Sequence, residues 1–134
     1  MLDISLSHDA QYSQSHYDTL IEQGQYLDAM HYCQGFWGHL NNWRDPIQLD
    51  AAIVLLGHLG RDRDSDAAML RGWRRFPNNP DFCCKYAFFL INRLGPIKAE
   101  LFAEQHHQLL SAVSDATDYL VLQICLQSTR KNFV

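Results

Sequence analysis

Apolar residues recur every three or four positions along most of the chain, and this is the period of a helix with one buried face. Tyr17, Leu20 and Ile21 share such a face, as do Phe82 and Tyr86 further on. No segment requires the strict alternation of a strand. The pattern predicts helices over residues 12–23, 26–41, 46–59, 64–76, 80–94, 97–112 and 115–128.

Glycine and proline separate the predicted helices at regular places. Gly60 and Gly95 come directly after apolar helix ends, where glycine can adopt the positive φ that closes a helix. Pro46 and Pro80 fall in first turns, where the missing amide hydrogen has no helical partner to lose. Asp64-Ser65 is expected to cap a helix that begins near residue 66.

The segments repeat one another at the length of a helix pair. The stretch AIVLLGHLG, which ends at Gly60, lies over AFFLINRLG, which ends at Gly95, after a shift of 35 residues. A shift of 36 places Gly24 over Gly60 and Trp37 over Trp73. A glycine that recurs at this interval, with a helix on each side, indicates a repeated helical hairpin.

The hairpins resemble those of the tetratricopeptide repeat family, whose unit is two antiparallel helices over about 34 residues. The resemblance is carried by EQGQYLDAMHY at the first corner, by FPNNPDF in the second unit and by NRLGPIKAELF in the third. Gly24, Tyr26 and Ala29 match the family's glycine, aromatic and small residue, and Pro77 matches its closing proline.

The chain also departs from the family pattern. Ser65 stands at the small position of the second unit, and in the third unit Ala99 arrives one residue early. The first unit ends near Asn41 with about five extra residues before Pro46. The aromatic residue that opens each first helix in the family is replaced by Ser13, Leu49 and Cys84.

The fold expected from these features is all-α, a right-handed stack of antiparallel helix pairs in a single domain over residues 1–134. The repeats would cover about 10–45, 46–80 and 81–113, and a capping helix over 114–128 would cover the third pair through Tyr119, Leu122, Ile124 and Cys125. The tail TRKNFV is expected to fray.

Composition narrows the range of functions. Hydrophobic residues make up 47% of the chain and charged residues 19%, which is typical of a folded globular protein. The net charge of -4 does not favour nucleic acid as a partner, since phosphate binding depends on a dense basic surface. No leader peptide or membrane-length apolar run is visible, so we expect a soluble, cytoplasmic protein. The cysteines form no CxxC pair and are expected to be reduced and buried.

Three motifs invite chemistry, and in each the simpler interpretation is favoured. DRDSDA, residues 62–67, begins like a calcium loop, but Ala67 and Trp73 replace the required glycine and glutamate. The histidines, His31 and His39 on one helix and the adjacent pair 106–107, lack metal-ligand spacing. RGWRRF, residues 71–76, is expected to present a solvated arginine face with Trp73 turned inward. No catalytic motif or cofactor loop is present, and we expect neither enzyme activity nor a cofactor.

The resemblance implies that a partner peptide lies in a concave groove lined by the first helix of each pair. Carried over by register, this partner-binding groove contains Gln14, Asp18, Glu22, Asp50, Val54, His58, Phe82, Lys85, Phe89, Asn92 and Arg93. Only Lys85 matches the family's carboxylate clamp, so a C-terminal acidic peptide is not the expected ligand. Phe82 and Phe89 have an equally simple interpretation as core residues.

The sequence therefore predicts a protein–protein interaction module with a protein or peptide partner, no nucleic acid and no membrane. Two alternatives remain open. The chain could be the N-terminal regulatory or scaffolding part of a larger enzyme such as a transferase or peptidase, or it could be a secretion-type chaperone.

Overall fold

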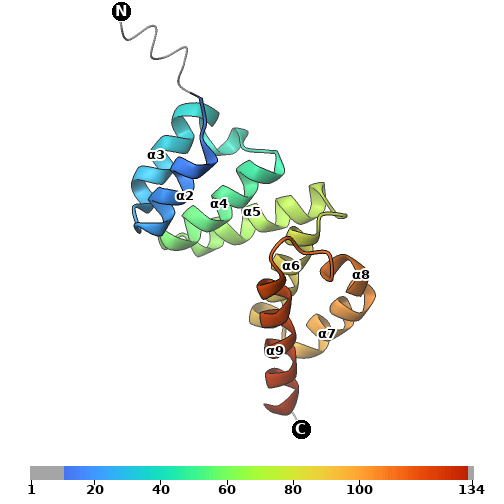
Figure 1. Cartoon of the computed structure of the whole chain (residues 1–134). Coiled ribbons are helices and arrows are strands. Elements are labelled where there is room, and N and C mark those ends of the chain that lie inside the picture. Colours follow the sequence, from blue (N-terminus) through green and yellow to red (C-terminus); the bar gives the residue numbers. More distant parts are fainter. Residues whose placement is uncertain (1–10, 133–134) are drawn as a thin grey trace, which may run out of the picture. The chain divides into compact units, whose positions relative to one another are not determined.

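The structure is a computed structural model that describes residues 11–132, with side chains up to residue 128. Within that range the chain is helical and contains no strand (Figure 1), as the hydrophobic period predicts. It divides into two compact units, Met1–Ser65 and Asp66–Val134. The boundary between them falls inside the predicted second repeat, 46–80.

Each unit is built from short helices. The first contains α2 (Gln14–Glu22), α3 (Tyr26–Trp37), a 3-10 turn η1 (Leu40–Asn42), α4 (Pro46–His58) and the first residues of α5 (Asp62–Arg75). The second contains the remainder of α5, then α6 (Pro80–Leu94), α7 (Pro96–Gln105), α8 (His107–Leu110) and α9 (Ala116–Asn132).

In the first unit α3 packs against both α2 and α4. The helices begin where the chain supplies a cap: Ser13 accepts a hydrogen bond from the His16 amide, and Asp45 and Gln48 form a reciprocal capping box around Pro46. The buried residues of this unit include Tyr17, Ala29, Met30, Cys33, Trp43, Leu49, Ala51, Ala52, Leu55 and Leu56.

Helix α3 ends at Trp37, earlier than the predicted residue 41. Gly38 has a φ of +75° and breaks the helix, and η1 follows it. Trp43 then turns back into the core, where it is 1% exposed and its indole N–H donates to the Gly38 carbonyl at 3.0 Å. The extra residues before Pro46 therefore contribute the large side chain of Trp43 to the core.

Gly24 and Gly60 form equivalent corners 36 residues apart. Their φ angles are +73° and +80°, a conformation that glycine adopts without steric cost. In both corners the amide after the glycine donates to the carbonyl five residues earlier, at 2.9 Å after Gly24 and 2.8 Å after Gly60. The predicted helix-glycine-helix repeat is present at these two positions.

Gly95 makes a tighter corner, with φ of +99° and ψ of 170°. This one residue ends α6 and begins α7, whereas three residues connect α2 to α3 and α4 to α5. The glycine-favoured geometry predicted at Gly60 and Gly95 is confirmed. Because α7 begins one residue sooner after its glycine, Ala99 becomes the fourth residue of its helix, the same place that Ala29 holds in α3 and Ser65 in α5.

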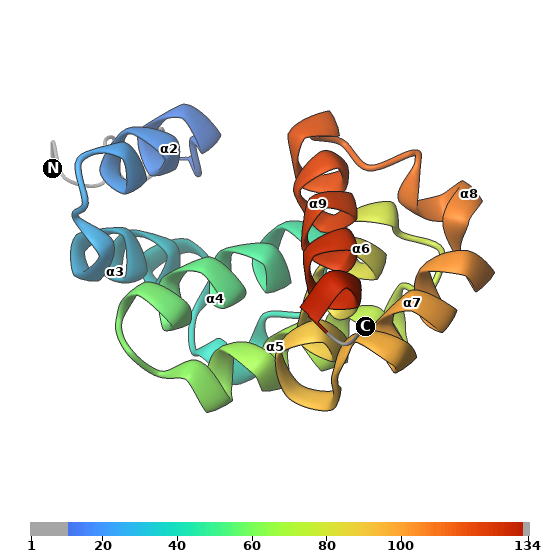
Figure 2. The ribbon, with the colours of Figure 1, turned by 90° about the horizontal axis from the view of Figure 1, so that it is seen from below.

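The second unit is organised around α6, which packs against α7, α8 and α9, and α9 also packs against α7 (Figure 2). Asn79 caps α6 and Pro80 occupies its first position. The backbone N–H and hydroxyl of Ser114 both donate to the Asp81 carboxylate, at 3.0 and 2.8 Å, and so place the start of α9 beside the start of α6. The core residues are Cys83, Cys84, Ala87, Leu90, Ala99, Phe102, Leu110 and Leu122.

Three predicted boundaries after Gly60 are wrong. Helix α5 begins at Asp62, so Ser65 does not cap it and instead donates its hydroxyl to the Ile53 carbonyl at 2.8 Å. The predicted helix over 97–112 breaks at His106. Helix α9 runs to Asn132, so most of the tail expected to fray is helical, while residues 133–134, like 1–10, lie outside the described residues.

Helix α9 is predicted to cap the third pair, but only some of the four side chains expected to do so are buried. Leu122 is buried and Tyr119 and Cys125 are half-buried, but Ile124 is 56% exposed. Leu120 and Val121 are exposed as well. This outer face of α9 is therefore apolar, whereas the cap of a helical stack is expected to be polar outside.

Candidate functional site

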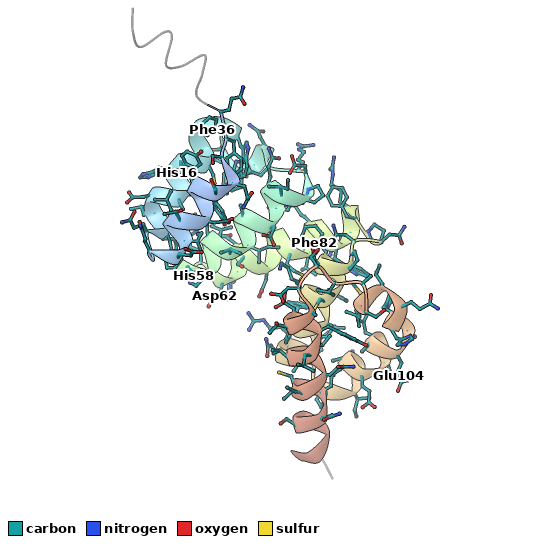
Figure 3. All side chains as sticks on the ribbon, viewed as in Figure 1. His16, Phe36, His58, Asp62, Phe82 and Glu104 are labelled. Atoms are coloured by element: carbon teal, nitrogen blue, oxygen red, sulfur yellow. The ribbon has the colours of Figure 1, made fainter. Side chains whose placement is uncertain are left out.

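The predicted groove residues of the first unit lie mostly on its surface. Gln14, Asp18 and Glu22 are exposed on α2, and the Gln14 amide donates to the Asp18 carboxylate at 3.0 Å. On α4, Asp50 and Val54 are half-buried. His58 at the end of α4 is exposed (Figure 3), and its ring stacks on that of Tyr26 with centroids 4.0 Å apart.

Phe82 belongs to the core of the second unit, so its predicted place on a binding surface is corrected. The side chain is 2% exposed, and its ring lies over the backbone of Gly72 in α5. A Cβ added at Gly72 would be 2.4 Å from Cε1 of Phe82. Phe89, about two turns further along α6, is half-buried beside Tyr86.

The polar groove residues of α6 are more accessible. Asn92 and Arg93 are exposed and Lys85 is half-buried. The Arg93 guanidinium contacts one oxygen of Asp66, with Nη2 at 2.7 Å and Nε at 3.2 Å. A carboxylate of a partner would have to displace Asp66 from this exposed pair. Because the predicted residues are divided between two units, the single groove that joins them remains a prediction.

A cleft in the second unit offers a better-defined site. It has a volume of about 760 Å³ and is open to solvent. None of the predicted groove residues lines it. Its walls come from α5, the turn before α6, α7 and α8: Trp73, Pro77, Asn78, Glu104, Gln105, His106, His107, Gln108, Leu109 and Ala112.

His106 shapes this cleft because it interrupts the helix. Its backbone leaves helical geometry between α7 and α8, with φ of -115° and ψ of 23°. The ring stacks on Phe102 with centroids 4.1 Å apart, and Nδ1 lies 3.0 Å from the Phe102 carbonyl oxygen. Since a carbonyl only accepts, Nδ1 carries the proton of this bond, and Nε2 of the neutral ring is left as an acceptor.

Trp73 forms the aromatic wall of the cleft. Its ring stacks on Tyr86 with centroids 5.5 Å apart, and the rings of Phe102 and His106 meet it at steep angles. These contacts fix the orientation of the indole without covering it, and it stays half-buried. The indole therefore gives the cleft an apolar surface of fixed position.

Most of the polar wall consists of side-chain amides. Asn78, Gln105 and Gln108 each carry a donor and an acceptor. Glu104 on α7 (Figure 3) is the acidic residue of the lining, and no lysine or arginine is part of it. The cleft therefore offers hydrogen bonds to uncharged polar groups, and its lining includes no lysine or arginine to anchor a carboxylate.

None of the sequence patterns points to this site. Trp73 is expected to turn inward, and the uninterrupted helical pattern across residues 97–112 conceals the break at His106. One signal was available: the alignment of Trp37 with Trp73, two large aromatic residues at equivalent ends of a second helix.

The buried thiols provide no nucleophile. Cys33, Cys83 and Cys84 are free and buried, as predicted, whereas Cys125 is half-buried. Burial raises the pKa of Cys33 and Cys83 to about 12 and that of Cys84 to about 11. A thiol reacts as its thiolate, so these residues are inert at neutral pH.

Two further properties concern only the part of the chain that the structure describes. Within it, no group of three or more His, Cys, Asp or Glu side chains could hold a metal ion, and the acids of DRDSDA lie in the first turns of α5. Also within it, no helix has the length and apolarity to span a bilayer.

The chain was compared with protein families, curated proteins and solved structures. No family model matches the chain, and no curated protein or solved structure matches it either. Any statement of function therefore depends on the geometry of the two units.

Proposed function

We propose that this chain is a non-catalytic binding domain that holds an extended segment of a partner protein in the cleft of its second unit. The observation that carries the proposal is the cleft of about 760 Å³, in which three amide side chains lie with the fixed ring of Trp73.

The openness of the cleft favours a chain segment over a small molecule. Its volume is within the range of about 300–1,000 Å³ that ligand sites occupy. Enclosed pockets bury most of a small ligand, however, and an open cleft does not. An extended segment can cross such a cleft and leave on both sides, so the open geometry does not limit its fit.

The lining matches the groups that every peptide segment carries. Backbone N–H and C=O groups alternate along an extended chain, and the amides of Asn78, Gln105 and Gln108 can pair with both kinds. Trp73 and Leu109 supply apolar surface for one side chain of the segment. Aromatic residues in such positions carry much of the energy in protein interfaces.

The resemblance to tetratricopeptide arrays agrees with this kind of function, because partner peptides lie against helices in those arrays. The proposed location differs from the family's, since it uses α7, α8 and the turn before α6 rather than the first helix of each pair. The proposal therefore needs the cleft and does not need the predicted groove.

The test is a selection of peptides from a displayed random library on the purified protein, followed by affinity measurement. We expect the double variant Gln105→Ala, Gln108→Ala to bind the selected peptides at least tenfold more weakly, about 1.4 kcal/mol, because both amides lose their hydrogen bonds. Both side chains are exposed, so the variant should keep the thermal stability of the parent.

Asn92→Ala is the matched control, since Asn92 is an exposed amide on α6 that belongs to the predicted groove and not to the cleft. We expect it to bind normally. If Asn92→Ala and Lys85→Ala abolish binding while the cleft variant binds normally, the partner uses the predicted groove. If the library yields no binding peptide, the proposed function fails.

A further inference from the structure

We propose that a second binding surface lies in the first unit, around Trp37, and that it takes an arginine or lysine side chain of a basic protein segment. This surface, called the Trp37 surface, consists of Tyr12, Tyr32, Phe36 and Trp37. It belongs to a different unit from the cleft and does not depend on the function proposed for the cleft.

The rings of this surface are in direct contact. The centroid of Tyr12 lies 4.6 Å from that of Trp37, 5.7 Å from that of Tyr32 and 6.1 Å from that of Phe36. Tyr32 and Phe36 are also 5.1 Å apart on α3. His16 of α2 approaches Tyr32 at 4.5 Å, and Figure 3 shows His16 and Phe36 on these neighbouring helices.

Hydrogen bonds hold two of the rings at their phenolic ends. The backbone N–H of Ser13 donates to the Tyr32 hydroxyl at 2.8 Å, and the Tyr12 hydroxyl donates to the Gln14 side chain at 3.1 Å. Trp43 packs against Trp37 from the core, with centroids 5.1 Å apart, and is 1% exposed. The surface is therefore preformed, and a ligand would not need to order it.

The rings are incompletely covered. Phe36 is 38% exposed, and Tyr12, Tyr32 and Trp37 are half-buried. Trp43, in contrast, is an aromatic side chain of the same unit that is completely buried in the core, with 1% exposure. The four outer rings keep accessible area that a further side chain can cover.

Negative charge accompanies the rings. The Met1–Ser65 unit has nine acidic and three basic residues. Asp28 lies one turn before Tyr32, which lies one turn before Phe36, so all three share a face of α3. Burial is the main cause of the raised pKa of Tyr12, and the Asp18 carboxylate contributes to the rise.

Aromatic faces beside carboxylates favour a cation over other ligands. The negative face of a ring attracts an ammonium or guanidinium group within about 6 Å, and guanidinium also stacks on it. The surplus of acidic residues attracts a basic segment from a distance and repels an acidic one. Arginine uses both the rings and the carboxylates, so we expect it to bind more tightly than lysine.

The test is a titration of the full chain with a synthetic peptide of alternating arginine and glycine, followed by amide NMR shifts of α2 and α3. We expect saturable binding that weakens as salt rises, and at least tenfold weaker binding of the peptide in which glutamate replaces arginine. Phe36→Ala should weaken binding at least fivefold while the protein stays folded, as far-ultraviolet circular dichroism of the variant would show, because the ring is 38% exposed and lies outside the buried core.

Leu27→Ala is the matched control, since Leu27 is 57% exposed on the same helix and is not part of the Trp37 surface. It should bind the arginine peptide normally. Equal binding of both peptides would overturn the proposal. So would weakening by Asp28→Asn together with normal binding by Phe36→Ala, since that result would indicate general attraction to an acidic surface without a ring site.

Discussion

Trp37 and Trp73 hold equivalent places in the repeated sequence but have different surroundings. Trp37 is covered by Tyr12, which precedes its hairpin, and by Trp43, which follows it. The rings that contact Trp73 belong to α6, to α7 and to the junction of α7 with α8, all later in the chain. The repeat thus preserves the helix and its corner. The side chains that pack around each tryptophan differ, so Trp37 belongs to the Trp37 surface and Trp73 lines the cleft.

The largest effect should come from removing the last helix. Deletion of residues 115–134 exposes the cores of α6 and α7 that Leu122 covers, so the second unit should unfold or aggregate while the first keeps its structure. Hydrogen exchange on each unit would measure this. If α6 stays as protected as before, α9 contributes nothing to the stability of the second unit.

Point substitutions on α9 should affect stability strongly on its buried face and weakly on its exposed face. Leu122→Ala removes a side chain that is 0% exposed and should cost about 2–5 kcal/mol. Leu120→Ala, at a position 57% exposed, should change the free energy of unfolding by less than about 0.5 kcal/mol. Urea unfolding followed by far-ultraviolet circular dichroism would compare the two.

Glycine-to-alanine substitutions in equivalent second helices should have opposite signs in the two units. Gly72→Ala places a Cβ 2.4 Å from the Phe82 ring, so we expect a loss of about 1–3 kcal/mol from overpacking. Gly35→Ala in α3 meets nothing within 4 Å and should stabilise the protein by up to about 1 kcal/mol. A stabilising Gly72→Ala in thermal unfolding would show that α5 and α6 are not in close contact.

The corners can be compared with the same substitutions. Gly60→Val and Gly95→Val should each cost about 1–2 kcal/mol, because a β-branched residue is strained at positive φ. Asparagine tolerates the left-handed conformation, so Gly60→Asn should lose less stability than Gly95→Asn, whose ψ of 170° lies outside that region. Equal melting temperatures for the two asparagine variants would contradict the difference between the corners.

The protein should also lose stability at alkaline pH. In the unfolded chain thiols ionise near pH 9, whereas burial raises the pKa of Cys33 and Cys83 to about 12, so the folded state binds more protons between these values. The free energy of unfolding should therefore fall above pH 9, by up to about 1.4 kcal/mol per pH unit for each thiol.

Urea unfolding at pH 7.5, 9 and 10 under reducing conditions would measure this slope, and Cys83→Ala should make it shallower. The second unit contains two such thiols and the first contains one, so the second should be the more sensitive. A free energy that stays constant to pH 10 would contradict the burial of these thiols.

The features that the sequence predicted correctly are those encoded by local chemistry. The three corners contain Gly24, Gly60 and Gly95 because their positive φ angles strain any residue with a Cβ. Two helices begin at Pro46 and Pro80 because the φ angle of proline fits a first helical turn. Such rules need no knowledge of distant contacts, so the helices and their order could be predicted.

The features that were missed depend on contacts between elements. The spacing of Phe82 fits either the groove or the core, and its packing on the bare backbone of Gly72 in α5 decides for the core. His106 lies in a continuous helical pattern, and its stacking on Phe102 and contact with the Phe102 carbonyl accompany the break. The cleft follows from that break, which the helical period across residues 97–112 does not indicate.

The double hydrogen bond between Ser114 and Asp81 also has a consequence for the order of folding. These residues are 33 positions apart, whereas the pair of α6 and α7 meets across the single residue Gly95. Closing a short loop costs less chain entropy than closing a long one, so the hairpin should form early and α9 should dock last. During synthesis α9 also leaves the ribosome after the helices that it covers. During synthesis the hairpin of α6 and α7 therefore stays uncovered until α9 has emerged.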